Sequence, residues 1–251
     1  MKPLLCAAIA ALLVAPDLAK ADFHIRSPNE IDQGEFEIEH NGSATFDHHD
    51  DKSGAQSYTA ELGAGVNDWW HPEFELDIER EAGEGAPTRV TGGTFENTFR
   101  LTETGEGWVD LGFYAEYSYS SLRGVADDVL FGPLLQKDVG RTTHTLNLFL
   151  SKQIGSVQDS HGFDFSYAWQ SRWNIYRYLS PAVEVYGDAG QVDRPGAFKQ
   201  QQLIAGPVAV GSLFLGDAAG KFKYEVGYLF GMTPASPAGT LRWKMEVEVP
   251  F

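Results

Sequence analysis

The residues with the clearest chemical potential are acidic side chains that alternate with apolar ones. Two stretches, Glu35 to Glu39 and Glu73 to Glu79, carry a carboxylate at every second position. A period of two places such residues on one face of a β-strand. Rows of charge of this kind can line a watery lumen and favour cations or polar solutes by electrostatic focusing. The predicted pore-lining residues are Glu35, Glu37, Glu39, Glu73, Glu75, Asp77, Arg172, Arg242, Lys244, Glu246 and Glu248.

The same rows have a second interpretation, in which the interior holds an ion-pair network and conducts nothing. Small barrels are filled by side chains, so this alternative stays open. Closing a barrel sets its first strand beside its last, and we therefore expect Arg242 and Lys244 near the row from Glu35 to Glu39.

A second candidate is the run Asp47-His48-His49-Asp50-Asp51, which offers ligands suited to zinc or copper. Neighbouring residues rarely all face one ion, and no distant ligand pattern supports the site. The run is interpreted as a solvated acidic loop, and no metal or other cofactor is predicted.

The spacing of histidine and serine residues bears on whether the chain could be a hydrolase. Barrel phospholipases and lipid A deacylases place a catalytic histidine and serine two residues apart on one strand face, so that the base reaches the hydroxyl. None of the 7 histidines has a serine at that spacing. The sequence therefore predicts a protein that is not an enzyme.

The element that organises the rest is the final stretch, Gly239 to Phe251. Its odd positions are apolar, its even positions are charged from Arg242 to Glu248, and it ends in an aromatic residue. This is typical of the closing strand of an outer-membrane barrel, with apolar side chains toward lipid and charges toward the lumen. It also resembles the C-terminal assembly signal of bacterial outer-membrane proteins, which would comprise Trp243, Met245, Val247, Val249 and Phe251.

Similar alternation predicts eleven earlier strands, near 34–40, 56–64, 69–80, 88–101, 109–119, 127–135, 142–152, 162–176, 181–188, 200–213 and 221–231. The sixth is the least regular, because Pro133 interrupts it. The connections tend to alternate between long and short. The predicted fold is all-β, an up-and-down antiparallel transmembrane β-barrel of about 12 strands that spans 34–251. A secreted β-sandwich or lipocalin-like barrel, whose apolar face points inward, is the alternative.

The N-terminal residues and the composition indicate where the protein is located and which partners it has. Residues 1–21 have a basic start, an apolar run and a small-x-small site, as in a secretory signal peptide, and 22–33 is interpreted as a periplasmic N-terminal tail. Cys6 is the only cysteine, so disulfides are not expected. A formal net charge of −16 with no basic cluster excludes nucleic acid as a partner.

Several motifs suggest a family. The chain resembles Gram-negative outer-membrane β-barrels, and Phe131-Gly132-Pro133, Ala205-Gly206-Pro207 and Tyr228 to Thr233 resemble the phenol meta-pathway outer-membrane family. It is also similar to uncharacterised proteobacterial envelope proteins that begin as Phe23 to Ile31 does. The resemblance implies the bacterial outer membrane as location, and outer-membrane lipid, lipopolysaccharide and the assembly machinery as partners. For function it implies transport of small hydrophobic compounds.

The predicted function is a passive channel or transporter for small solutes with an acidic lumen. The alternatives are a non-conducting structural or adhesive barrel that acts through its extracellular loops, and a barrel hydrolase.

Overall fold

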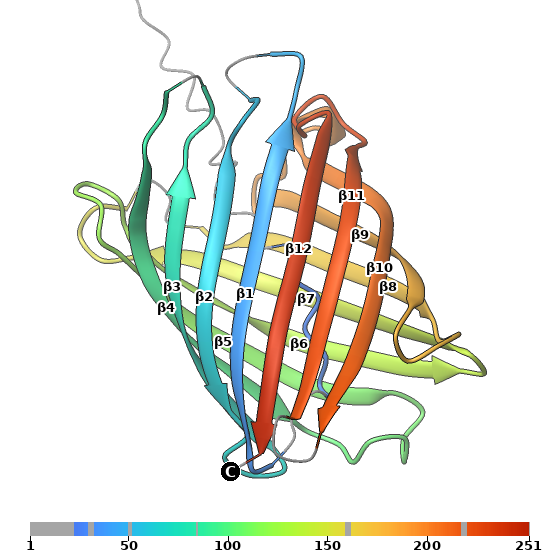
Figure 1. Ribbon diagram of the computed structural model, residues 1–251. Coiled ribbons are helices and arrows are strands. Elements are labelled where there is room, and N and C mark those ends of the chain that lie inside the picture. Colours follow the sequence, from blue (N-terminus) through green and yellow to red (C-terminus); the bar gives the residue numbers. More distant parts are fainter. Residues whose placement is uncertain are drawn as a thin grey trace, which may run out of the picture.

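The protein is a closed antiparallel β-barrel of twelve strands (Figure 1). The computed structural model describes residues 23–29, 33–49, 52–83, 85–158, 162–216 and 220–250. The strands are β1 (Glu35–Phe46), β2 (Gln56–Ala64), β3 (Trp70–Arg80), β4 (Thr88–Arg100), β5 (Asp110–Ser120), β6 (Asp127–Val139), β7 (Thr142–Ile154), β8 (Asp164–Trp173), β9 (Ser180–Gln191), β10 (Gln202–Gly216), β11 (Gly220–Gly231) and β12 (Gly239–Pro250). The predicted signal peptide, Asp50, Asp51 and Phe251 lie outside the described residues.

Each strand pairs with the next along the chain, and β1 pairs with β12 to close the barrel. This confirms the predicted up-and-down topology. A 3-10 turn, η2 (Phe198–Gln200), precedes β10. Within the described residues, no helix has the length and apolar character needed to cross a bilayer.

The strand ends that differ most from the prediction are those of β1 and β6. Asn41 to Phe46 was expected to begin a loop, because it is rich in small polar residues, but it continues β1 in register with both β2 and β12. Ladder hydrogen bonds on both sides outweigh the local loop preference of such residues. β6 likewise continues past Pro133 to Val139.

The Gly-Pro pairs of β6 and β10 are places where one ladder is interrupted. On the β7 side, pairing passes from Phe131 to Leu134 without a change of register. A Cβ atom at Gly132 would lie 1.8 Å from Leu148 O, and one at Gly206 would lie 2.1 Å from Tyr228 O. Glycine is therefore required at both positions, since each lets two backbones approach closely.

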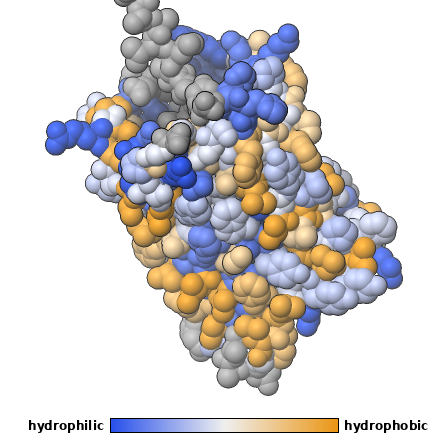
Figure 2. Space-filling model, turned by 45° about the horizontal axis from the view of Figure 1, so that its top comes forward, coloured by the Kyte–Doolittle hydropathy of each residue, from blue (hydrophilic) through white to orange (hydrophobic). Residues whose placement is uncertain are grey.

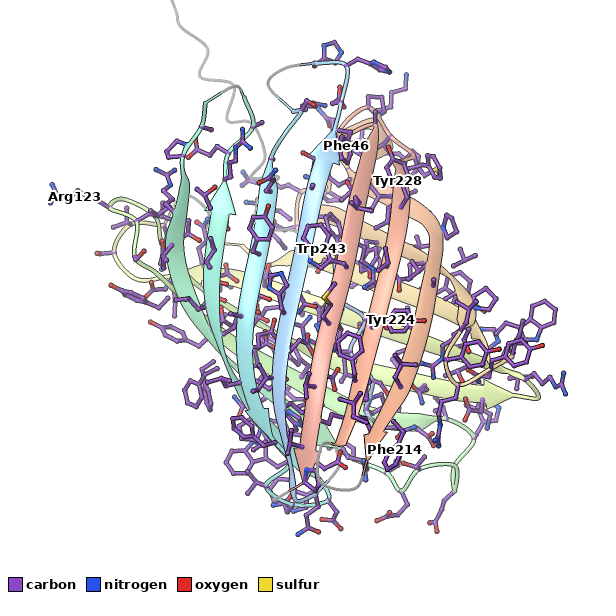
Figure 3. All side chains as sticks on the ribbon, viewed as in Figure 1. Phe46, Arg123, Phe214, Tyr224, Tyr228 and Trp243 are labelled. Carbon is purple, nitrogen blue, oxygen red and sulfur yellow. The ribbon has the colours of Figure 1, made fainter. Side chains whose placement is uncertain are left out.

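The outer face of the barrel is apolar. Ile38, Leu62 and Phe74 point outward and are at least half exposed. Figure 2 shows apolar side chains over the lower part of the outer face and hydrophilic ones nearer the upper loops. Tyr224 and Trp243 lie on this outer face, over β11 and β12 (Figure 3). Exposed apolar residues outside and ionisable residues inside match a barrel that faces lipid, and oppose the lipocalin-like alternative.

The barrel has two rims. We call the rim where β1 begins and β12 ends the terminal rim, at the bottom of Figure 1, and the opposite one the far rim. The terminal rim carries exposed aromatic residues, as expected of an interfacial girdle. They are Trp69, Trp108, Trp173, Tyr176 and Tyr178.

Candidate functional site

The interior of the barrel contains the start of the described chain. Residues 23–29, which we call the plug, run inside the barrel from the terminal rim toward mid-height (Figure 1). His24 to Ser27 are buried among lumen-facing side chains. The sequence had placed these residues in a lead-in ahead of the barrel, so the plug was missed.

Arg26 fixes the plug to the β4, β5 and β7 wall. Its Nη2 donates to both carboxylate oxygens of Glu96, at 3.0 and 3.2 Å. The guanidinium lies 4.2 Å from the centre of the Tyr114 ring, a cation–π contact. Asn147 completes the attachment through the backbone: its Oδ1 accepts from Arg26 N at 2.9 Å, and its Nδ2 donates to Arg26 O at 2.7 Å. A charged pair and a two-way amide contact therefore hold one residue.

The opposite side of the plug is apolar. Ile25 packs into a buried cluster on the β8 to β11 wall that includes Ile204 and Leu229. The Phe23 ring packs edge-on against Tyr186 at 5.4 Å. The plug thus alternates, with apolar side chains toward one wall and polar ones toward the other.

The lower part of the plug is anchored near the terminal rim. Ser27 Oγ donates to Gln136 Oε1 at 2.7 Å, and Asn29 Nδ2 donates to Asp110 Oδ2 at 2.7 Å. Pro28 fits against Gly112, where a Cβ atom would lie 2.7 Å from Pro28 Cβ. The glycine in β5 leaves the space that the proline fills.

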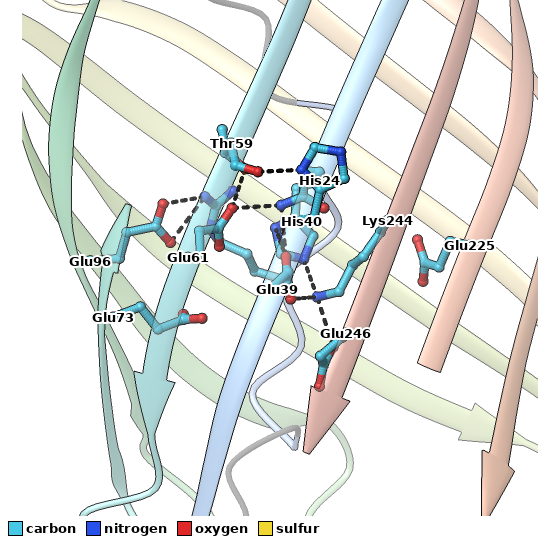
Figure 4. Close-up of polar contacts among 12 residues, drawn as sticks. His24, Glu39, His40, Thr59, Glu61, Glu73, Glu96, Glu225, Lys244 and Glu246 are labelled. Carbon is cyan, nitrogen blue, oxygen red and sulfur yellow. Dashed lines mark hydrogen bonds and ion pairs between the residues drawn. The ribbon is translucent and has the colours of Figure 1, made fainter. Parts of the chain in front are cut away.

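A charge network joins the plug to the closing seam (Figure 4). Lys244 Nζ on β12 lies 2.5 Å from Glu39 Oε2 and 3.2 Å from Glu246 Oε2. It also donates to His24 Nε2 at 2.9 Å, which requires that nitrogen to be unprotonated. Lys223 Nζ on β11 extends the network to Glu246 at 3.0 Å. The seam between β1 and β12 is therefore tied to the plug by one lysine.

Arg242 belongs to a second network. Of the two bases expected near the row from Glu35 to Glu39, Lys244 reaches it and Arg242 does not, because the register sets Arg242 opposite Ser43, beyond that row. Arg242 instead reaches across β11, where it binds Glu184 with Nε at 2.8 Å and Glu225 with Nη2 at 2.5 Å. Glu184 also accepts from Gln170 at 2.7 Å and from the Tyr186 hydroxyl at 2.8 Å. All of these groups are buried or nearly so.

Between the plug and the far rim the lumen is open. The cavity has a volume of about 460 Å³, which we call the vestibule. Phe23, Phe149 and Tyr186 contribute apolar surface to it. Its acidic lining residues are Glu75, Asp77, Glu79, Glu116, Asp128, Asp164 and Asp188, and its basic ones are His24 and Arg26. The vestibule therefore combines an apolar floor with acidic walls.

The predicted pore-lining residues divide into three groups. Glu75 and Asp77 line the vestibule. Arg172 lies at the terminal end of β8, where its Nε donates to Asn174 Oδ1 at 3.1 Å. The others belong to the ion-pair networks inside the barrel, and they are Glu35, Glu37, Glu39, Glu73, Arg242, Lys244, Glu246 and Glu248.

Several ionisable residues of the lumen are not among the predicted pore-lining residues. Glu61, Glu96 and Glu184 are almost fully buried, and none of them belongs to a row of alternating acids in the sequence. The alternation of inward and outward positions along each strand could have identified them, because each lies on the face that its strand turns to the lumen.

The acidic loop from Asp47 to Asp51 is built around Asp47. Its Oδ1 accepts from His49 N and its Oδ2 from Ala238 N, both at 2.9 Å. The His49 N–H, the main cause, holds the pKa of Asp47 below its ordinary value. Both oxygens are used in shaping the connection, and no three-ligand group involving Asp47, His48 or His49 occurs in the described part of the loop.

The described histidines are not paired with serine side chains. His40 Nδ1 lies 2.7 Å from Thr59 O, and His144 Nε2 lies 3.0 Å from Thr142 Oγ1. Among the residues that the structure describes, no hydrogen bond joins a histidine to a serine hydroxyl. His161 lies outside these residues.

Comparison with known proteins bears on the barrel. The structure is similar to the COG4313 outer membrane channel from Pseudomonas putida F1, with a TM-score of 0.62 and 14% sequence identity over 89% of this chain and 98% of that chain. The chain has the fold of an outer membrane channel. This confirms, at the level of the fold, the resemblance seen in the sequence.

Other comparisons add little. A bacterial polysaccharide outer membrane secretin matches 88% of this chain and 99% of its own at 9% identity, and its TM-score of 0.36 is too low to support an argument. No protein-family model and no curated protein matches the chain.

Proposed function

We propose that the protein is an outer-membrane channel for small solutes, closed in its terminal half by the plug and open as an acidic vestibule toward the far rim. The observation that carries the proposal is the division of one lumen into two parts, a vestibule of about 460 Å³ and a closed segment built around Arg26. A barrel with only a structural role has no need of a vestibule of that size. The far rim is assigned to the cell exterior, because the connections there are mostly the longer ones.

The lining of the vestibule favours small solutes that are cationic or carry an apolar part. Its volume lies within the range of roughly 300–1,000 Å³ that is usual for small-molecule sites. Carboxylates in a low-dielectric wall attract cations and raise their local concentration. Phe23, Phe149 and Tyr186 add surface for an apolar group, in keeping with the small hydrophobic compounds that the family resemblance implies.

Conductance of the refolded protein in planar lipid bilayers tests the proposal. The mature chain is expected to show small ohmic steps, or brief openings when the plug shifts. If neither the mature chain nor a chain with a loosened plug conducts, the protein is a non-conducting barrel and the proposal is wrong. Release of fatty acid from phospholipid by the purified protein would instead favour the hydrolase.

Cation selectivity should depend on the vestibule acids. The triple variant Asp77→Asn, Asp128→Asn, Asp188→Asn removes three carboxylates from the wall and leaves the plug contacts intact. We expect the ratio of cation to anion permeability, measured from reversal potentials in a salt gradient, to fall by about 3-fold or more at low salt, where screening is weak.

A matched control removes three acids outside the vestibule. Asp68, Glu103 and Glu106 are exposed in turns at the terminal rim. The variant Asp68→Asn, Glu103→Gln, Glu106→Gln changes the net charge equally and should leave most of the selectivity in place. An equal loss in both variants would show that the overall charge, and not the vestibule, sets selectivity.

A further inference from the structure

Three neighbouring strands bring a histidine and two carboxylates together in the terminal half of the lumen. His71 and Glu73 on β3 meet Glu37 on β1, with β2 between them. His71 Nε2 lies 3.3 Å from Glu37 Oε2 and 3.7 Å from Glu73 Oε1, and the three ligand atoms all lie within 4.8 Å of one another. The His71 and Glu37 side chains are more than nine-tenths buried.

The His71 ring nitrogen is placed as a ligand rather than as a hydrogen-bond donor. Neither carboxylate contact meets hydrogen-bond geometry, and Nε2 has no hydrogen-bond partner among the described residues. In a tetrahedral zinc site with bonds of about 2.1 Å, ligand atoms are roughly 3.4 Å apart, close to both measured distances. The spacing therefore suits an ion shared by the three groups.

The strand between them leaves space for the His71 and Glu73 side chains to lie close together. Gly63 on β2 pairs with Glu37 on one side and with Glu73 on the other. A Cβ atom at Gly63 would lie 2.6 Å from His71 Nε2 and 2.7 Å from Glu73 Cγ. A cavity of about 30 Å³ adjoins these side chains, lined by Glu37, His71 and Glu73. That volume is enough for an ion and a water molecule.

The surroundings of this site carry an excess of carboxylates. They include Glu35, Glu37, Glu39, Glu61, Glu73, Glu96, Glu246 and Glu248. The lysines and arginines that contact them are Arg26, Lys221, Lys223 and Lys244. Lys244 and Arg26 line the same cavity, where Lys244 pairs with Glu39 and Glu246 and Arg26 pairs with Glu96. Burying carboxylates without compensating positive charge is costly, and a divalent cation supplies that charge.

We propose that Glu37, His71 and Glu73 form a binding site for a divalent first-row transition cation, best represented by Zn²⁺. One imidazole nitrogen and two carboxylate oxygens suit such ions, whereas Ca²⁺ and Mg²⁺ prefer oxygen ligands alone. The bound cation joins β1 to β3 across β2 and offsets the excess of acid. The site is distinct from the vestibule and does not depend on the proposed channel function.

Isothermal titration of the refolded full barrel with ZnCl₂ tests the proposal. The background is His48→Gln, His49→Gln, so that the exposed loop histidines do not contribute. We expect one Zn²⁺ per barrel, and a loss of affinity of about 10-fold or more in His71→Asn and in Glu37→Gln. Gly63→Ala, which keeps all three ligands but fills their space, should also weaken binding.

His144→Gln is the matched control, because His144 faces outward and stacks on Trp169. It should leave zinc affinity unchanged. Folding of each variant is checked by its migration before and after heating, and Zn²⁺ should raise the unfolding temperature of the background protein but not of the His71 variant. Absence of zinc binding in the background protein, or equal affinity in folded His71→Asn, would overturn the site.

Discussion

Replacing Arg26 with alanine is expected to raise the single-channel conductance of the barrel several-fold. The guanidinium binds Glu96 through two hydrogen bonds and lies over the Tyr114 ring. A hydrogen-bonded pair of opposite charges in a buried site is among the stronger side-chain attachments. Without it Glu96 is left beside Glu116 with no guanidinium between them, and the upper part of the plug loses its side-chain contacts with β4 and β5. Bilayer recordings at fixed voltage measure the result.

Two further variants separate the plug from general effects of charge. Asn147→Leu removes both amide contacts with the Arg26 backbone and leaves the charge unchanged, so it should also raise conductance, by a smaller factor. Arg123→Ala removes an arginine from an exposed connection and should change nothing. If Arg26→Ala and Arg123→Ala conduct alike, the plug does not close the lumen.

Replacing Arg242 with methionine should be the most damaging single change to stability. Arg242 is almost fully buried between Glu184 and Glu225, and its removal leaves two carboxylates facing each other inside the barrel. Breaking a buried ion pair from one side costs about 3–5 kcal/mol. The free energy of unfolding, measured by urea titration of the protein refolded in lipid vesicles, should fall by that amount.

The cause of the loss can be tested by rescue. The triple variant Arg242→Met, Glu184→Gln, Glu225→Gln removes the charges together and should recover most of the stability, since a neutral replacement of a whole buried network is often tolerated. Arg89→Met breaks the exposed pair with Glu81 and should cost less than about 1 kcal/mol. A similar loss in Arg89→Met and Arg242→Met would contradict the assignment of Arg242 as a buried anchor.

The barrel could be predicted from the sequence because strands have a strict period that each residue reports locally. Ile38 and Phe74 alternate with glutamates, so the outer and inner faces of β1 and β3 follow without any knowledge of their neighbours. The position of the last strand and the pairing of Lys244 with Glu39 followed from closure of the barrel.

The plug could not be predicted in the same way, because its conformation comes from contacts with distant strands. Arg26 is held by residues 70 and 121 positions away. Nothing in its immediate neighbours indicates a buried site. The available signal was the scarcity of basic residues, 19 lysines and arginines against 35 acids, which makes each base a candidate partner for the interior carboxylates.

The partner of Arg242 was mispredicted for a related reason. Parity gives the face of a residue but not its height along the barrel, and the stagger between β1 and β12 sets Arg242 opposite Ser43. Its partners Glu184 and Glu225 lie on β9 and β11, which are three strands and one strand away from β12.

The contact between Lys244 and His24 has a consequence for the order of assembly. It joins residues 220 positions apart, one on the last strand and one on a segment enclosed by the whole barrel. Once β12 pairs with β1, the wall is continuous and residues 23–29 can enter only by threading through a rim past buried side chains. The simpler route is for residues 23–29 to pack against the open, curved sheet before β12 pairs with β1. Pairing of β12 with β1 would then enclose residues 23–29. The slowest step of folding would be the one that brings β12 to β1, because these strands are far apart in the sequence.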